Sequence, residues 1–408
     1  SNVILAWTRK HSSKSMKHTR DYYYDINRRF LSIIGQWPYQ KPKARLFFLA
    51  LVFTCLINTA ITQIAKLLMC KNEQCIFEVL PPHFLMWNIL VKVFTFRFNN
   101  QKIKNLTDQL FANWDIFETQ EEREIMKKYA ENGRRYVLIY SSYLYVTAIS
   151  YTITSLWPCI MDAIIPLNTS RPIMLIWEAY YFVDEEKYYY YILCDMLIIF
   201  MICLTGLIAH DCMFFTYINH VCGLFAVVGF RFEHMTYKCD IASRNLIDCL
   251  DNAYHRQFVF SIHVHRKALQ FAKLIESVFS ISFAIQLAIV TVAVSISLLQ
   301  VSIQLHHNIV EATRYFLFVV AQLFYLFCFS LQGQKLMDYS LDIRDKIYNS
   351  AWYELPVKRQ KMFLIVMRRG IEASTVTACQ IYVYSLQNFT TILQTAMSYF
   401  TVLASFNE

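Results

Sequence analysis

The sequence predicts an all-α membrane protein with seven transmembrane helices, a cytoplasmic N-terminus and an extracellular C-terminus. Three observations lead to this prediction. Hydrophobic residues make up 56% of the 408 positions and charged residues only 17%, against roughly 25% charged residues in ordinary soluble domains. Several apolar runs reach about 20 residues, which is the length that crosses a bilayer core. Lys and Arg also concentrate in alternate connections between these runs.

The apolar runs number seven, and each is expected to form a helix because a helix satisfies its own backbone hydrogen bonds in lipid. They cover residues 46–66, 77–96, 136–157, 189–212, 277–304, 314–332 and 380–405. Residues 1–45 contain no apolar core of a signal peptide, so the first run is expected to direct insertion. The predicted units are a cytoplasmic segment at 1–45, helices one to six within 46–332, cytoplasmic extensions at 216–276 and 332–379, and the seventh helix within 380–408.

The distribution of basic residues predicts the orientation of these helices. Four connections contain 32 of the 39 Lys and Arg residues, and the four alternate connections contain 4. The basic connections are 1–45, 97–135, 216–270 and 332–379, and the others are 67–76, 158–188, 305–314 and 406–408. Cytoplasmic loops of membrane proteins carry the excess of Lys and Arg. The net charge of +9 is therefore assigned to cytoplasmic loops, and no nucleic-acid partner is expected.

Two features of the predicted outer loops agree with this orientation. Asn168 begins an Asn-Thr-Ser glycosylation sequon in the second outer loop, whereas the sequon at Asn105 falls inside and is expected to be unmodified. Cys70 and Cys75 flank the first outer loop. They could form a disulfide outside the cell or remain free thiols.

The sequence lacks the common motifs of catalysis, phosphate binding and metal binding. No two of the seven glycines lie within five residues of each other, which excludes the dinucleotide-binding, P-loop and nucleophile-elbow patterns. His263 and His265 are two residues apart and His306 and His307 are adjacent, so neither pair has helical ligand spacing. We expect no enzyme activity, no cofactor and no metal.

The last apolar run carries a polar stripe. Gln387, Thr391, Gln394, Ser398, Thr401 and Ser405 follow one another at spacings of 4, 3, 4, 3 and 4, which places them on one helical face. Such a face must meet water or other polar groups inside a membrane. It could make hydrogen bonds to neighbouring helices, or it could line an aqueous pore. One stripe cannot enclose a pore, so the second interpretation requires an oligomer.

Few ionisable residues fall within the runs. Asp195 lies about six residues into the fourth run and is expected to need a partner, either in a structural contact or near a ligand pocket. Lys92 lies near the inner end of the second run, where its side chain can reach the interface. The outer halves of the helices are rich in aromatic residues. An aromatic, mostly apolar cavity there would suit a small volatile ligand.

Three parts of the chain resemble insect odorant receptors, particularly those of ants and bees. They are the N-terminal Asp21-Tyr22-Tyr23-Tyr24 with Ile34-Gly35-Gln36-Trp37-Pro38-Tyr39, the second outer loop with Pro166-Leu167-Asn168, Arg171-Pro172 and Asp184-Glu185-Glu186-Lys187-Tyr188, and the C-terminal Phe389-Thr390-Thr391-Ile392-Leu393 and Ser398-Tyr399-Phe400-Thr401-Val402-Leu403. The resemblance covers essentially the whole chain.

This resemblance implies an odorant-gated, non-selective cation channel in the plasma membrane of an olfactory neuron. Four subunits would surround one pore lined by their seventh helices, and the cytoplasmic ends of helices four to seven would form an anchor that joins subunits. The implied partners are a small volatile odorant, the co-receptor Orco in a heterotetramer, lipid and permeant cations. Gln387-Asn388 and a shorter second inner loop differ from the co-receptor pattern and indicate a ligand-tuned subunit.

The resemblance also supplies candidate site residues. The odorant is expected in the outer half of the bundle, among Phe84, Trp87, Asn88, Val91, Tyr145, Ile149, Thr152, Met196, Phe200, Tyr315 and Val319. The family's hydrophobic gate falls on Val402 and Phe406, whereas the polar stripe points to Gln394, Ser398, Thr401 and Ser405. The two faces differ by about 100° of rotation around the helix.

Three other classes fit less well. A G-protein-coupled receptor also has seven helices, but it would place its N-terminus outside, and neither a D-R-Y nor an N-P-x-x-Y motif is present. A gustatory receptor would share the topology and channel class, but its closing signature is not found near Tyr399 and Phe400. A secondary transporter should show an internal repeat.

Overall fold

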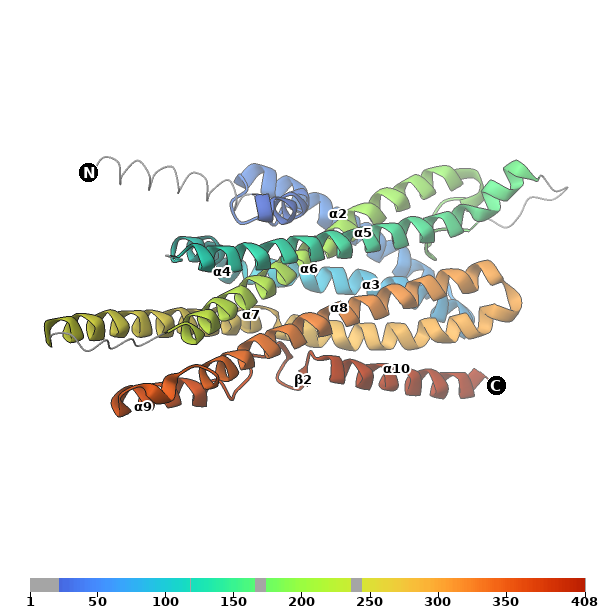
Figure 1. Ribbon diagram of the computed structural model, residues 1–408. Helices are drawn as coiled ribbons and strands as arrows, with labels where there is room; N and C mark the ends of the chain where they lie inside the picture. Colours follow the sequence, from blue (N-terminus) through green and yellow to red (C-terminus); the bar gives the residue numbers. More distant parts are fainter. Residues whose placement is uncertain (1–21, 118, 166–173, 236–243, 408) are drawn as a thin grey trace.

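The computed structural model describes residues 22–117, 119–165, 174–235 and 244–407 and forms a bundle of long helices (Figure 1). A short helix at residues 22–33 precedes the bundle. The following elements are α2 (Pro42–Met69), α3 (Glu73–Phe98), α4 (Asn100–Ala112), η1 (Asn113–Asp115), α5 (Gln120–Ile164), α6 (Glu185–Glu233), α7 (Arg244–His307), α8 (Ile309–Tyr348), η2 (Trp352–Glu354), α9 (Val357–Arg369), β1 (Thr377–Ala378), β2 (Tyr382–Val383) and α10 (Leu386–Asn407).

The predicted seven-helix, all-α membrane fold is confirmed. Six helices (α2, α3, α5, α6, α7 and α8) are long and apolar enough to cross a bilayer. The seventh, α10, has 22 residues, a length of about 33 Å, which also spans a bilayer core.

The seventh helix begins later than the sequence predicted. Residues within the run 380–405 were expected to be helical throughout, but β1 and β2 pair as a short antiparallel hairpin, with Thr377 opposite Val383. Cys379 and Gln380 adopt positive φ angles of 52° and 60° in the turn of this hairpin. The helix therefore starts only at Leu386.

Local sequence signals set several helix ends. The side-chain oxygens of Thr119, Asp184 and Asn308 accept hydrogen bonds from first-turn backbone N–H groups of α5, α6 and α8, respectively. Each of these helices also has glutamate in its first turn, where a negative charge is favourable. Pro42 opens α2, at a position where its missing N–H costs nothing.

Four helices continue well beyond the predicted runs. α5, α6, α7 and α8 contain 45, 49, 64 and 40 residues. In Figure 1 the extended parts of α6, α7 and α8 gather with α9 at one end of the bundle, which we call the anchor end, and the C-terminus lies at the opposite end. The connections from α2 to α3, from α5 to α6 and from α7 to α8 lie at the C-terminal end.

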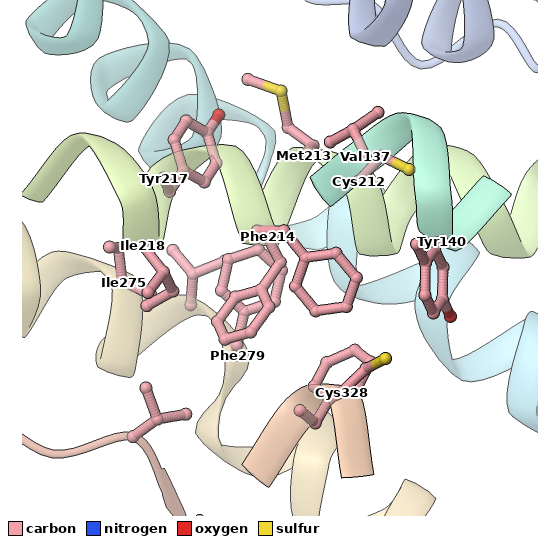
Figure 2. Close-up of a cluster of buried hydrophobic side chains, with 14 of the residues drawn as sticks. Val137, Tyr140, Cys212, Met213, Phe214, Tyr217, Ile218, Ile275, Phe279 and Cys328 are labelled. Atoms are coloured by element: carbon pink, nitrogen blue, oxygen red, sulfur yellow. The ribbon is translucent and has the colours of Figure 1, made fainter. Parts of the chain in front are cut away.

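The core is densest along the middle of α6. Residues 206–229 of this helix are all buried, and Figure 2 shows Phe214 and Phe279 at the centre of a cluster of apolar side chains. The Phe214 ring stacks on Phe329 with 5.3 Å between centroids and meets Phe283 edge-on at 5.0 Å. Close packing of this kind, rather than transfer from water, holds helices together in lipid.

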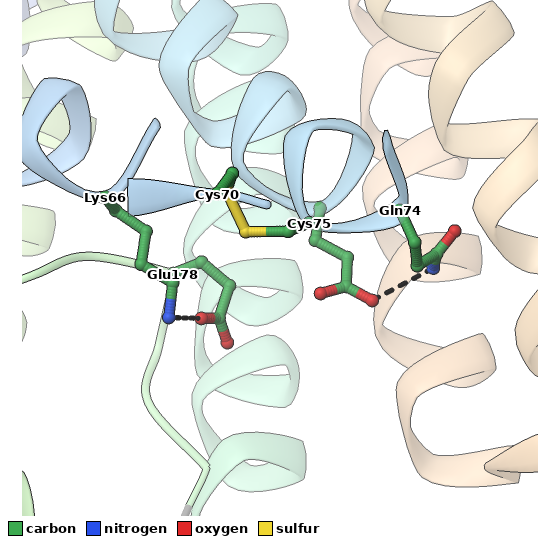
Figure 3. The surroundings of a disulfide bond; sticks show 6 residues. Lys66, Cys70, Gln74, Cys75 and Glu178 are labelled. Atoms are coloured by element: carbon green, nitrogen blue, oxygen red, sulfur yellow. Dashed lines mark hydrogen bonds and ion pairs between the residues drawn. A yellow bond between two sulfur atoms is a disulfide. The ribbon is translucent and has the colours of Figure 1, made fainter. Parts of the chain in front are cut away.

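The connection between α2 and α3 contains a disulfide between Cys70 and Cys75 (Figure 3). The sequence left this pairing open. Next to it, Lys66 of α2 forms an ion pair with Glu178 at 2.8 Å. The disulfide joins the end of α2 to the first turn of α3, and the ion pair joins the last turn of α2 to the residues before α6.

Gly333 allows α8 to pack closely against the segment that precedes α10. A Cβ atom at this position would lie 2.1 Å from the Tyr384 carbonyl oxygen, which is backbone and cannot move aside cheaply. We predict that Gly333→Ala destabilises the protein by about 1–3 kcal/mol, the usual cost of overpacking, as measured by thermal unfolding of the purified protein.

Gly206→Ala is the matched control for this prediction. A Cβ atom at Gly206 would meet only Ile34 Cγ2, at an ordinary contact distance of 3.7 Å. Alanine also favours the helix by about 1 kcal/mol, so this variant should be as stable as the wild type or more so. Equal stability of the two variants would contradict the close contact at Gly333.

Candidate functional site

A cavity of about 160 Å³ lies among α2, α3, α5, α6, α7 and α8. An engineered protein cavity of roughly 150 Å³ accommodates benzene, so this cavity is large enough for a small ring or a short chain. Its wall is predominantly apolar, with a few polar side chains from α2, α3, α5 and α8. Cavities of this kind bind small apolar molecules with a few oriented polar contacts.

Three of the eleven predicted pocket residues line this cavity: Phe84, Asn88 and Phe200. The other eight are not part of its wall. Trp87 and Ile149 are 44% and 55% exposed on the outside of the bundle. Met196 and Val319 are buried in the protein interior. The remaining four are half-buried elsewhere, namely Val91, Tyr145, Thr152 and Tyr315.

The eleven candidates include no residue of α2, of α7 or of the loop before α6, and all three contribute to the wall. Thr59 and Gln63 of α2, Val290 and Ala293 of α7, and Trp177 from the connection before α6 all line the cavity. Gln63 carried a signal, because a long polar side chain inside an apolar run needs a polar partner. Its Oε1 oxygen accepts a hydrogen bond at 3.1 Å from His83 Nδ1. Trp177 carried no signal in the sequence, since only tertiary structure brings this loop over the bundle.

The loop of residues 174–184 contributes Trp177 to the wall of the cavity. Arg314 of α8 holds the loop by donating to the carbonyl oxygens of Leu175 and Ile176 at 3.0 and 2.7 Å. The backbone N–H of Tyr180 donates to the Thr62 carbonyl of α2 at 3.0 Å. These hydrogen bonds attach the loop to α8 and to α2, and the loop places Trp177 in the cavity wall.

Asp195 has the partners that the sequence required. Asn58 Nδ2 and the Tyr181 hydroxyl both donate to its Oδ2 oxygen at 3.0 Å. Burial, and then the nearby Asp195 carboxylate, raises the pKa of the Tyr181 hydroxyl, so this group remains a donor. The contacts of Asp195 join α6 to α2 and to the loop before α6. Asp195 does not line the cavity, so its role in this structure is a structural contact.

A buried charge pair lies beside the cavity, which corrects the prediction that Lys92 reaches the interface. Lys92 of α3 and Asp211 of α6 form an ion pair, and each side chain is only 3% exposed. Tyr140 of α5 donates to the second Asp211 oxygen at 2.7 Å. The ammonium of Lys92 also lies 4.6 Å from the ring centroid of Tyr325, a cavity residue of α8.

An aromatic series connects this cavity wall to α10. The rings of Tyr325 and Phe329 lie 4.6 Å apart on α8. Phe329 contacts Tyr384 with 6.2 Å between centroids, and Phe283 of α7 lies 5.3 Å from Tyr384. Tyr384 is buried two residues before the start of α10. The rings therefore form a continuous packed path from the cavity wall to the segment that precedes α10.

The polar stripe of α10 faces away from the helices of its own chain. Every residue of the stripe is exposed, and the hydroxyls of Ser398, Thr401 and Ser405 donate to carbonyl oxygens of α10 itself. The opposite face packs on α7, where Ser295 donates to the Ala396 carbonyl at 3.1 Å. Hydrogen bonding of the stripe to neighbouring helices is therefore not observed within the described part of the chain.

Val402, one of the two gate residues that the resemblance supplied, falls on the same open side. Val402 is 52% exposed, and Gln394, Ser398, Thr401 and Ser405 are exposed as well. The side chain of Phe406 and the sequon residue Asn168 lie outside the residues whose side chains the structure describes. Among the described residues, no cluster of three or more His, Cys, Asp or Glu side chains could hold a metal ion.

The helical membrane fold, the internal cavity and the unpartnered α10 stripe define a class of multi-pass membrane protein. A family model described as "7tm Odorant receptor" matches residues 74–397, and the chain belongs to this family. The match separates it from gustatory receptors, G-protein-coupled receptors and transporters, and its relatives are receptors rather than enzymes.

Curated relatives are insect odorant receptors of low identity. Odorant receptor 22c of Drosophila melanogaster is 30% identical over 104 residues, 26% of each chain, and Odorant receptor Or2 of Anopheles gambiae is 27% identical over 158 residues, 39% of this chain and 38% of the relative. The matched stretches thus span well under half the length of these relatives.

Solved structures match over almost the whole chain. The olfactory receptor OR5 of Machilis hrabei in complex with eugenol superimposes with a TM-score of 0.79 at 16% identity, covering 95% of this chain and 99% of that one. The same receptor in a second structure gives a TM-score of 0.72 at 15% identity, covering 96% and 98%. These similarities establish the fold.

We predict strong coupling between Lys92 and Asp211. Lys92→Met leaves a buried carboxylate without its counter-charge, and Asp211→Leu leaves a buried ammonium, so each should cost about 3–5 kcal/mol. The double variant removes both charges and should recover most of this loss. Thermal unfolding of the four proteins measures the coupling. Additive losses in the double variant would mean that the two side chains do not stabilise one another.

Proposed function

We propose that the chain is an odorant-gated, non-selective cation channel subunit that opens when a small volatile molecule binds in the cavity. The observation that carries this proposal is the polar stripe of α10, which faces away from the chain's own helices. A membrane helix with such a face requires water or a partner on that side. The stripe contains no formal charge, which suits the passage of cations with little discrimination between them.

An oligomer is needed to complete the pore, because one stripe cannot enclose water. We propose a tetramer in which α10 of each subunit lines the pore and the co-receptor Orco supplies the other subunits. The departure of Gln387-Asn388 from the co-receptor pattern supports the role of a ligand-tuned subunit. The anchor end, with α9 and the extensions of α6 to α8, is proposed as the inter-subunit region.

The proposed orientation places the anchor end in the cytoplasm and the cavity in the outer half of the membrane. The Lys and Arg distribution supports it. The disulfide between Cys70 and Cys75 is further support, since disulfides persist in oxidising compartments. Asn168 is then available for glycosylation in the second outer loop.

The proposed mechanism is a shift in population toward the open state. A ligand that binds better to the open arrangement favours it by its difference in affinity. Movement of Tyr325 in the cavity wall would pass through Phe329 to Tyr384 and so to α10. Near its C-terminal end, α10 carries Val402, where an apolar constriction would close the pore by dewetting.

Currents from cells expressing the chain with and without Orco test this proposal. Ala148 lines the cavity and is 6% exposed, so Ala148→Phe should fill the space and abolish the response to volatile ligands while the basal current persists. Val402→Ala should instead raise the basal current by widening the constriction. The measurement is whole-cell current during application of a panel of volatiles.

Ile149→Phe is the matched control, because Ile149 is the next residue of α5 but is 55% exposed outside the cavity. It should respond like the wild type at equal surface abundance. Silence of the wild-type chain with every ligand, despite surface expression with Orco, would count against the channel proposal. The same loss in Ala148→Phe and Ile149→Phe would count against the cavity as the binding site.

A further inference from the structure

The cavity wall contains side-chain hydrogen-bonding groups that have no partner. Asn88 of α3 is 4% exposed, and its Oδ1 oxygen is buried without a hydrogen bond among the described residues. The Oε1 oxygen of Gln322 on α8 and the Nε1–H of Trp177 are unpaired in the same way. All three residues line the cavity.

The other polar groups of the wall are already engaged. The hydroxyls of Thr59, Thr147 and Tyr151 donate to the carbonyl oxygens of Cys55, Tyr143 and Ile176 at 2.9, 2.9 and 3.0 Å. The Tyr325 hydroxyl donates to Gln286 at 2.6 Å, and Gln63 is paired with His83. Among the described wall residues, the buried side-chain atoms that lack a partner are therefore the Asn88 and Gln322 oxygens and the Trp177 indole N–H.

We propose that this site selects small, mostly apolar molecules that carry one hydroxyl group, a statement that rests on the cavity being the ligand site proposed above. A hydroxyl both donates and accepts, so it can donate to the Asn88 or Gln322 oxygen and accept from a carboxamide N–H or from Trp177. A carbonyl or an ether only accepts, and a hydrocarbon does neither. The last torsion of a carboxamide side chain is broad, so either of its ends can turn toward the ligand.

The physical basis of this selectivity is the cost of leaving a buried acceptor unpaired. An apolar ligand leaves the buried Asn88 and Gln322 oxygens without partners, whereas a hydroxyl group toward which one of these carboxamides turns gives it a hydrogen bond. Sites built to bind a hydroxyl reject analogues that lack it much more strongly than apolar pockets distinguish a methylene. We expect at least a tenfold preference, which corresponds to about 1.4 kcal/mol.

Ligand-induced thermal stabilisation of the purified chain measures this preference without requiring channel activity. The probes are benzyl alcohol, benzaldehyde, benzyl methyl ether and toluene, which differ mainly in the hydrogen-bonding group. Benzyl alcohol should give half-maximal stabilisation at a concentration at least tenfold below those of the other three. Equal concentrations for all four, or a lower concentration for benzaldehyde, would overturn the proposal.

Variants of the wall assign the preference to particular residues. Asn88→Leu and Gln322→Met keep similar volumes but remove the unpaired oxygens, so each should reduce the preference for the alcohol at least threefold. Thr152→Val is the matched control, because Thr152 lies on α5 outside the cavity wall and its hydroxyl already donates to the Ala148 carbonyl oxygen, so its loss should leave the preference unchanged. A preference that survives in the double variant Asn88→Leu/Gln322→Met would contradict the assignment.

The outcomes separate this inference from the channel proposal. Stabilisation by the alcohol without any evoked current would retain the hydroxyl preference and argue against channel function. Evoked currents of equal sensitivity to all four probes would retain the channel and overturn the hydroxyl preference. Neither stabilisation nor current with any probe would overturn both.

Discussion

The ion pair between Lys92 and Asp211 constrains the whole bundle, because two charges this deeply buried must remain together. The partners lie 119 residues apart in sequence, on α3 and α6, and losing either one leaves an uncompensated charge at a cost of several kcal/mol. Tyr140 adds α5 to the arrangement, and Tyr325 adds α8 through its ring beneath the ammonium. Tyr325 in turn donates to Gln286 of α7. Contacts around this pair therefore fix the positions of five helices, α3, α5, α6, α7 and α8, relative to one another.

The aromatic side chains next to this ion pair lie between the cavity and the segment that precedes α10. Tyr325 belongs to the cavity wall, and its neighbour Phe329 contacts Tyr384 just before α10. Gly333 brings α8 against the same segment so closely that no side chain fits between them. Packed cores respond to strain by moving between discrete arrangements rather than by deforming smoothly. In the proposed mechanism, this core converts the filling of the cavity into a movement of α10.

Much of the fold could be predicted from the sequence, whereas most of the cavity could not. Run length and composition predicted the helices, because the thickness of the bilayer sets the length of a spanning helix and its apolar interior requires apolar side chains. The polar stripe of α10 was predicted by its spacing alone. The cavity depends on how each helix is rotated: Asn88 lines it, while Trp87, one residue away, is exposed. Trp177 reaches the wall from a loop, and Lys92 is paired rather than exposed because of a partner far away in sequence.

Cysteine accessibility on α10 during ligand application tests the central claim, that ligand binding opens a pore lined by the polar stripe. Ser398 is exposed on the stripe and Ala396 is 3% exposed against α7, so Ser398→Cys and Ala396→Cys form a matched pair, with the wild type correcting for the exposed thiols of Cys194 and Cys379. A charged, membrane-impermeant methanethiosulfonate should irreversibly reduce the ligand-evoked current of Ser398→Cys alone. An evoked current that is unchanged in Ser398→Cys, or reduced equally in both variants, would contradict the account.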